Sequence, residues 1–82
     1  MYKAKVFITL KKSVLDTQGQ VVQRSLQALN FGGVEDVRVG KYIELQLQAA
    51  DKAAAEQTVR DMCERLLANT VIEQYKYEVS EA

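Results

Sequence analysis

The 82-residue chain has room for one domain, and its eleven basic residues are balanced by eleven acidic ones. Because nucleic acids and anionic membranes attract basic surfaces, the zero net charge argues against both as partners and favours proteins or small molecules. The apolar fraction of 48% predicts a folded domain over residues 1–82, and the lack of an uninterrupted apolar stretch makes the cytoplasm the expected location.

Apolar and polar residues alternate from Tyr2 to Lys11, which predicts a half-buried strand. Its core face consists of Ala4, Val6, Ile8 and Leu10. A helix is expected to start at Thr17, since Thr17 and Gln20 have the spacing of a capping box, with Asp16 as a rival cap. The apolar side of this helix consists of Val22, Leu26 and Leu29. Residues 30–33 end it, because asparagine and glycine tolerate left-handed backbone.

Residues 34–49 are strand-like throughout, but Gly40 interrupts them where the chain is able to reverse direction. A two-residue turn would place Val37 opposite Glu44 and mix apolar with charged side chains on one face. A three-residue turn at residues 40–42 avoids this mixing. It gives one apolar face that consists of Val37, Val39, Ile43, Leu45 and Leu47. The sequence therefore predicts a hairpin.

A second helix, which Asp51 is placed to cap, has the clearest helical periodicity in the chain. Its apolar positions are Ala55, Val59, Met62, Cys63, Leu66 and Leu67. Alternation from Val71 to Val79 predicts a last strand. The order β-α-β-β-α-β is that of the ferredoxin-like α+β architecture. Right-handed crossovers would place both helices on one face of a four-stranded antiparallel sheet, with the first and third strands in its centre.

Because helices are expected to cover only one face of this sheet, the other face meets water or another chain. The residues expected on it include Lys5, Phe7, Thr9, Glu44 and Gln46, surrounded by Lys11, Arg38 and Gln48. The plain interpretation is a solvated sheet face with one isolated aromatic ring. A domain this small gains burial by self-association, and lysines opposite glutamates allow pairing between copies. We therefore expect a homodimer or larger homo-oligomer through this face.

The residue types that carry most enzyme chemistry are missing or isolated. The chain has no histidine, and its one cysteine, Cys63, falls on the apolar side of a predicted helix, where it acts as a small hydrophobe. There is no cysteine or histidine pair at metal-ligand spacing and no glycine-rich loop that would hold a phosphate. We expect no catalytic, cofactor-binding or metal-binding residue in this chain.

RNA-recognition modules share this order of strands and helices, and they stack bases on aromatic residues of the open sheet face. Here Phe7 alone is well placed for stacking. Residues 42–46, which correspond to the aromatic RNA-binding motif, have an acid and an amide where bases would stack. RNA binding is not expected.

The segment DVRVGKYIEL, residues 36–45, closely resembles the hallmark of the PurS family, the small subunits of bacterial and archaeal formylglycinamide ribonucleotide amidotransferase. Other stretches agree in order and spacing: YKAKV (2–6), VLD (14–16) before QG (18–19), and CERLLAN (63–69) before VIE (71–73). The chain departs from the family at Thr17 and Thr70, where proline is frequent, and threonine suits the element starts that both occupy.

This resemblance implies a part in the fourth step of purine synthesis, in which formylglycinamide ribonucleotide is converted to its amidine. A glutaminase subunit (PurQ) releases ammonia from glutamine, and a synthetase subunit (PurL) activates the substrate amide with ATP and Mg²⁺. The chain resembles the third component, an adaptor without catalytic residues that joins the other two so that ammonia passes between them. Whether such a chain counts as an enzyme depends on its partners.

Four residues on or beside the predicted turn are expected to contact these partners: Arg38, Gly40, Lys41 and Tyr42. A charge-assisted donor, a flexible cation and an amphipathic ring on a protruding turn suit interface anchors. The alternative is that Gly40 only permits the turn and that its neighbours are solvated.

Two other functions use the same architecture. A small-molecule sensor binds its ligand between protomers, but here the segment after the first strand has only Gly19 in place of a glycine-rich turn. An enzyme of the acylphosphatase type needs an arginine and a backbone phosphate cradle after the first strand. Residues 11–14, KKSV, do not supply them.

Overall fold

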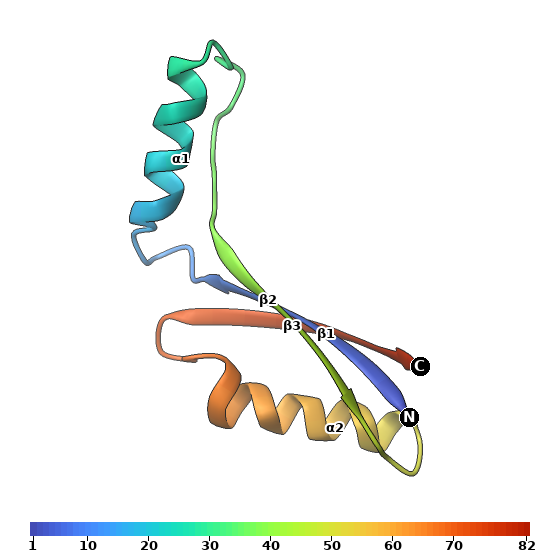
Figure 1. The fold of residues 1–82 in the computed structure, drawn as a ribbon. Helices are drawn as coiled ribbons and strands as arrows, with labels where there is room; N and C mark the ends of the chain where they lie inside the picture. The colour runs from blue at the N-terminus through green and yellow to red at the C-terminus, as the bar shows by residue number, and fades with distance from the viewer.

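Three strands and two helices alternate along the chain in the computed structural model, which describes residues 1–82. The elements are β1 (Tyr2–Leu10), α1 (Thr17–Ala28), β2 (Gly40–Leu47), α2 (Lys52–Met62) with the π-helical turn η1 (Cys63–Leu67), and β3 (Glu73–Glu81). The strands form one antiparallel sheet in the order β2-β1-β3 (Figure 1). An α+β fold with the first strand in the middle of the sheet is therefore confirmed.

The core lies between the sheet and α2. It consists of Ala4, Val6, Ile8, Ala55, Val59, Cys63, Ala68 and Val79. The register places Ile43 of β2 and Tyr77 of β3 on either side of Val6, so both edge strands add half-buried side chains to the same face. Full burial of an aliphatic side chain contributes about 1.5–3 kcal/mol, so Val6, Ile8 and Val59 carry much of the stability.

The π-helical turn changes which side chains reach this core. The N–H of Ala68 donates to the carbonyl of Cys63, five residues earlier (3.0 Å), and this interrupts the 3.6-residue period of the helix. Ala68 is buried as a result, whereas Leu66 is 82% exposed. The expectation that Leu66 belongs to the apolar side of the second helix is therefore wrong. Neither helix is long and apolar enough to cross a membrane.

The predicted four-stranded sheet is not formed, because residues 34–39 run beside α1 and pair with no strand. The side-chain amide of Gln23 donates to the carbonyl of Glu35 (3.0 Å), and the N–H of Val39 donates to Asp16 Oδ2 (2.8 Å). These bonds hold the segment against the helix. The predicted third strand, β2, is consequently an edge strand and not a central one.

The predicted turn at residues 40–42 is also wrong. These residues begin β2 and pair with residues 7–9 of β1. A Cβ atom at Gly40 would lie 2.8 Å from Thr9 Cγ2 and would collide with the carbonyl oxygen of Ile8. Gly40 therefore allows β2 to approach β1 closely. Glycine in a strand-like segment is found at such close approaches of two backbones as well as at turns.

Helix α1 does not cover the sheet, contrary to the prediction that both helices share one face. It begins after Asp16, whose carboxylate accepts a hydrogen bond from the N–H of Gly19 (2.8 Å), and ends before Asn30, which has a positive φ of 72°. Together with the connecting segments it forms an arm, residues 11–39, that projects from the end of the sheet (Figure 1). Gly19 is the only buried residue of α1.

Close contact at Gly19 fixes the direction of the arm. A Cβ atom there would collide with the carbonyl oxygen of Val37 and would lie 2.7 Å from Asp16 Oδ2. The first turn of α1 is thus pressed against the segment that leads into β2. Since the helix is held at its N-terminal end in this way, its remaining turns point away from the sheet.

Candidate partner interface

The residues predicted to contact partner subunits lie where the arm joins β2. Arg38 donates from its guanidinium to the carbonyl oxygens of Val14 (3.2 Å) and Lys12 (3.3 Å). These bonds tie the segment after β1 to the segment before β2. Arg38 therefore stabilises the base of the arm within its own chain, although its side chain remains accessible from outside.

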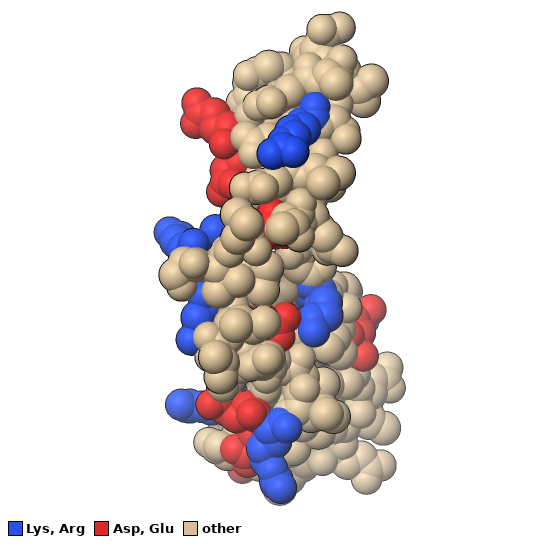
Figure 2. Space-filling model, turned by 90° about the vertical axis from the view of Figure 1, so that its left-hand side faces the viewer, with Lys and Arg blue, Asp and Glu red and all other residues tan.

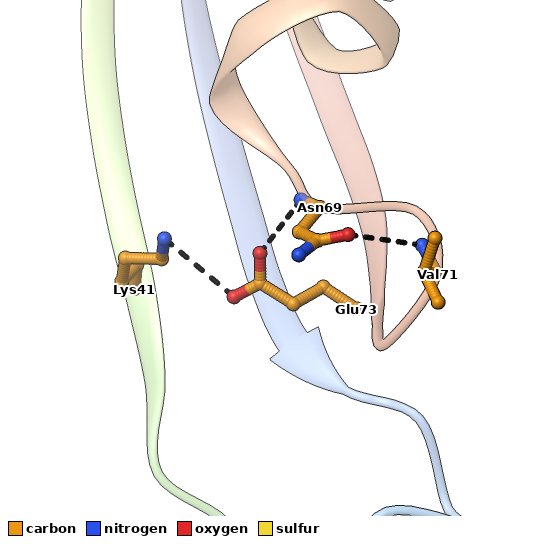
Figure 3. Close-up of polar contacts among 4 residues, drawn as sticks. All are labelled: Lys41, Asn69, Val71 and Glu73. Atoms are coloured by element: carbon orange, nitrogen blue, oxygen red, sulfur yellow. Dashed lines mark hydrogen bonds and ion pairs between the residues drawn. The ribbon is translucent and has the colours of Figure 1, made fainter.

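Lys41 takes part in a polar cluster that links the two edge strands (Figure 3). Its Nζ lies 3.5 Å from Glu73 Oε2, and Glu73 Oε1 accepts a hydrogen bond from the N–H of Asn69 (2.8 Å). Asn69 Oδ1 accepts another from the N–H of Val71 (3.2 Å). Because Lys41 pairs with Ile8, this cluster lies on the α2 side of the sheet, where Lys41 covers the Glu73 carboxylate.

Tyr42 lies on the opposite, uncovered side of the sheet and is 51% exposed. Its ring packs against Phe7, with centroids 5.1 Å apart and planes inclined by 36°. Lys76 of β3 places its Nζ 5.4 Å from the centroid of the same Phe7 ring, a distance typical of a cation–π contact. Phe7 is therefore the centre of a cluster to which all three strands contribute.

The residues predicted for self-association share this uncovered side of the sheet. Together with three residues of β3 that the sequence analysis did not include, they form a surface that we call the open face: Lys5, Phe7, Thr9, Glu44, Gln46, Gln74, Lys76 and Glu78. The sequence contains the signal that places these three residues there, since residues 74, 76 and 78 alternate with the apolar positions of the last strand.

Polar side chains of the open face pair with one another or with Lys3, which lies on the same side of β1. Lys3 Nζ lies 2.9 Å from Glu44 Oε1. This hydrogen-bonded ion pair lowers the pKa of the Glu44 carboxyl and raises the pKa of the Lys3 ammonium. Gln74 Nε2 donates to Thr9 Oγ1 (3.3 Å). Figure 2 shows basic and acidic side chains interspersed along one side of the molecule, with no broad area of a single sign.

Cys63, the single cysteine, lies neither on the open face nor at the base of the arm. Cys63 is fully buried beneath the sheet, and burial raises the pKa of its thiol, which disfavours the reactive thiolate. No three histidine, cysteine, aspartate or glutamate side chains come together as a metal site. The open face and the base of the arm instead present an exposed aromatic ring, ion pairs and amide side chains. Groups of these kinds make contacts between protein chains.

Known proteins match this chain from end to end. The family model described as PurS, phosphoribosylformylglycinamidine (FGAM) synthase, matches residues 3–81. The phosphoribosylformylglycinamidine synthase subunit PurS of Bacillus subtilis is 53% identical over 81 residues, which cover 99% of this chain and 95% of that protein.

Solved structures agree with the sequence match. The crystal structure of Methanocaldococcus jannaschii PurS superposes with a TM-score of 0.89 at 39% identity, covering 100% of this chain and 99% of that one. A chain in the structure of PurLQS from Thermotoga maritima superposes with a TM-score of 0.89 at 30% identity, covering 96% of both chains. The similarity therefore includes the arm as well as the sheet.

Proposed function

Because the chain belongs to the PurS family of phosphoribosylformylglycinamidine synthase subunits, we propose that it is the adaptor of this ligase of purine biosynthesis. It joins a glutaminase subunit (PurQ) to a synthetase subunit (PurL), so that ammonia released from glutamine reaches the activated substrate without escaping into solution. ATP, Mg²⁺ and glutamine are used by these partners. The observation that carries the proposal is the whole-chain match to a chain in PurLQS of Thermotoga maritima.

The surface chemistry supports a role in binding. Around Phe7 the chain presents aromatic rings, a lysine and amides on the face of the sheet that no helix covers. Its one thiol is buried, with a raised pKa. A chain with these features supplies shape and contacts to a complex whose reacting groups belong to other subunits.

Among the four residues first expected at the interface, Tyr42 is the one that we assign to direct contact. Its ring is half exposed, and aromatic side chains often anchor interfaces. Arg38 and Lys41 already bond within the chain, and Gly40 allows the two strands to approach. These three residues shape the surface on which Tyr42 lies.

We further propose that the adaptor acts as a homodimer. The molecule is elongated and measures 51 × 27 × 14 Å, so much of its chain lies near the surface. Light scattering coupled to gel filtration tests this part of the proposal. A mass of twice 9.2 kDa at micromolar concentration is expected, and a mass of one chain would overturn it.

Reconstitution tests the adaptor function. The synthetase and glutaminase subunits of the same organism are assayed for amidine formation, with and without this chain, using either glutamine or an ammonium salt as the nitrogen source. Glutamine-dependent turnover should require the chain, whereas ammonium-dependent turnover should require it far less. Equal glutamine-dependent rates with and without the chain would refute the function.

A Tyr42→Ala variant tests the contact residue. We expect it to weaken capture of the synthetase by about thirtyfold or more, because truncation of an interface anchor costs about 2 kcal/mol or more. Lys52→Ala, at an exposed position on α2, is the matched control. Equal capture by both variants would remove Tyr42 from the interface.

A further inference from the structure

A cavity of about 310 Å³ lies at the base of the arm, where three segments of the chain come together. The segment after β1, the first turns of α1 and the segment that leads into β2 all contribute side chains to it (Figure 1). Only three of its ten lining residues are hydrophobic. Small-molecule sites begin at about this size, and so polar a lining suits a small polar ligand.

Charged side chains of both signs line this cavity without pairing with one another. Lys12 and Arg38 are its basic residues, and Asp36 is an acidic residue beside them. None of the three takes part in an ion pair of the chain. Arg38 uses two N–H groups for the carbonyls of Val14 and Lys12, which leaves its other N–H donors free. Charges of both signs are therefore available to a ligand.

The combination of charges decides the class of ligand. An anion would be attracted by Lys12 and Arg38 but repelled by Asp36, and a cation would meet the reverse. Asp16, the remaining charged residue of the lining, already binds two backbone N–H groups. With two basic and two acidic residues, the lining is neutral overall. A ligand that carries one charge of each sign is attracted by both kinds of side chain.

Amide side chains line the part of the cavity that α1 contributes. Gln20 and Gln23 lie about one turn apart on this helix, and both line the cavity. Gln23 Nε2 donates to the carbonyl of Glu35 (3.0 Å), which leaves Oε1 of Gln23 as an acceptor. Because an amide is both a donor and an acceptor, these side chains suit a ligand that carries an amide of its own.

We propose that this cavity binds a free α-amino acid with a carboxamide side chain. Lys12 and Arg38 bind the carboxylate of this ligand, and Asp36 binds its ammonium group. Gln20 and Gln23 bind its amide. Glutamine, which the proposed partner subunits consume, belongs to this class. Binding is a property of the chain alone, so the site goes beyond the adaptor function and does not depend on it.

Calorimetric titration of the purified chain with L-glutamine tests the site. Two analogues each lack one of its charges: glutaramate has no ammonium group, and L-glutaminamide has no carboxylate. L-Glutamine should bind about tenfold more tightly than either analogue or more, because a hydrogen bond between charged groups contributes at least that factor. Tighter binding of glutaramate or of inorganic phosphate would make the cavity an anion site and overturn the proposal. No binding of L-glutamine at millimolar concentration would overturn it as well.

Two variants show which residue binds which charge of the ligand. Asp36→Asn should weaken binding of L-glutamine by about tenfold or more, yet strengthen binding of glutaramate, because it removes the repulsion of a carboxylate. Lys12→Ala should likewise weaken binding of L-glutamine, yet strengthen binding of L-glutaminamide, because it removes the repulsion of an ammonium group. Unfolding would weaken every ligand, so these opposite changes separate the loss of a contact from the loss of the fold. Equal weakening of all three ligands would overturn the assignment.

Neighbouring residues of the same charge provide the matched controls. Glu35→Gln removes a carboxylate and Lys11→Ala removes an ammonium group, but neither side chain lines the cavity. Both variants should bind L-glutamine as tightly as the wild type does. If Glu35→Gln weakens binding as much as Asp36→Asn, only the net charge of the chain matters and the site is refuted.

Nuclear magnetic resonance locates the ligand on the folded chain. Titration with L-glutamine should shift the amide signals of residues 12–14, 20–23 and 36–38 and leave those of α2 unchanged. Shifts confined to α2 or to the open face would overturn the proposal. Reconstituted glutamine-dependent turnover that requires the chain, without binding of L-glutamine to the chain itself, refutes this inference alone. Binding by a chain that such turnover does not require refutes the adaptor function alone.

Discussion

The carboxylate of Asp16 accepts a hydrogen bond from the backbone N–H of Val39, which lies 23 residues further along the chain (2.8 Å). The other oxygen of the same carboxylate caps α1 through the N–H of Gly19 (2.8 Å). Asp16 is the one charged residue among the buried ones, at 7% exposed. One side chain therefore starts the helix and also fixes where β2 begins.

Replacing Asp16 with alanine is expected to destabilise the protein more than replacing an ordinary helix cap. The control is Asp51→Ala, because Asp51 caps α2 through a single bond to Ala54 and binds no other segment. Loss of that cap costs about 1 kcal/mol. Asp16→Ala breaks two bonds and leaves the N–H of Val39 without its partner, so its urea midpoint should fall further. Equal midpoints at one protein concentration would contradict the double role.

The same carboxylate predicts how stability depends on pH. The hydrogen bonds from Gly19 and Val39 lower the pKa of Asp16 below its usual value of 3.8. A carboxyl with a lowered native pKa stabilises the fold fully above its unfolded pKa, and the effect is lost as pH falls through the native value. The stability gap between the wild type and Asp16→Asn should therefore be constant near neutral pH and shrink below pH 3.8.

Urea denaturation from pH 7 to pH 2 measures this gap. Asp51→Asn serves as the control for general effects of acid, because it removes a carboxylate at a helix start without touching the arm. A gap for Asp16→Asn that stays the same down to pH 2 would mean that ionisation of Asp16 does not contribute to the fold.

Local periodicity was enough to predict β1, α2, β3 and most of the core, but not the exposure of Leu66 or the burial of Ala68. Alternation in the first strand singles out Val6 and Ile8, and helical spacing singles out Val59 and Cys63, all of which are fully buried. These signals are local because each depends on the geometry of one element. They predict which side of an element is buried, and the prediction holds until the π-helical turn changes the helical period and exposes Leu66.

The errors concern which elements meet. Glycine in a strand-like segment marks either a turn or a close approach, and the sequence around Gly40 does not distinguish the two uses. The apolar side of α1 predicts that this side of the helix is buried, but it does not predict which surface packs on it. Asp16 was weighed only as a helix cap, because its bond to Val39 joins segments that no local pattern connects.

A methyl group at Gly40 is expected to separate the first two strands. Gly40→Ala would push against Thr9 and the carbonyl of Ile8, at a cost of about 1–3 kcal/mol for an overpacked site. Gly33→Ala is the control, since nothing lies within 4 Å of its added methyl group and its φ is not positive. That variant should change the free energy of unfolding by no more than about 0.5 kcal/mol. If Gly40→Ala is equally mild, the close approach does not constrain the strands.

Two substitutions of the buried Cys63 separate the effects of side-chain volume and polarity on the free energy of unfolding. Cys63→Ala removes one atom from a fully buried site and should cost about 1 kcal/mol, because a small void remains. Cys63→Ser keeps the size but buries a hydroxyl, which costs about 1–3 kcal/mol when it lacks a partner.

Serine should therefore destabilise the protein at least as much as alanine, although it is the closer match in shape. In the folded wild type, a thiol reagent should react slowly at neutral pH, because burial raises the pKa of Cys63 and blocks access. The reaction rate should then follow the unfolded fraction as urea is added. Rapid reaction without urea would show that the core opens at α2. A serine variant as stable as the wild type would show that a hydroxyl at position 63 finds a hydrogen-bond partner.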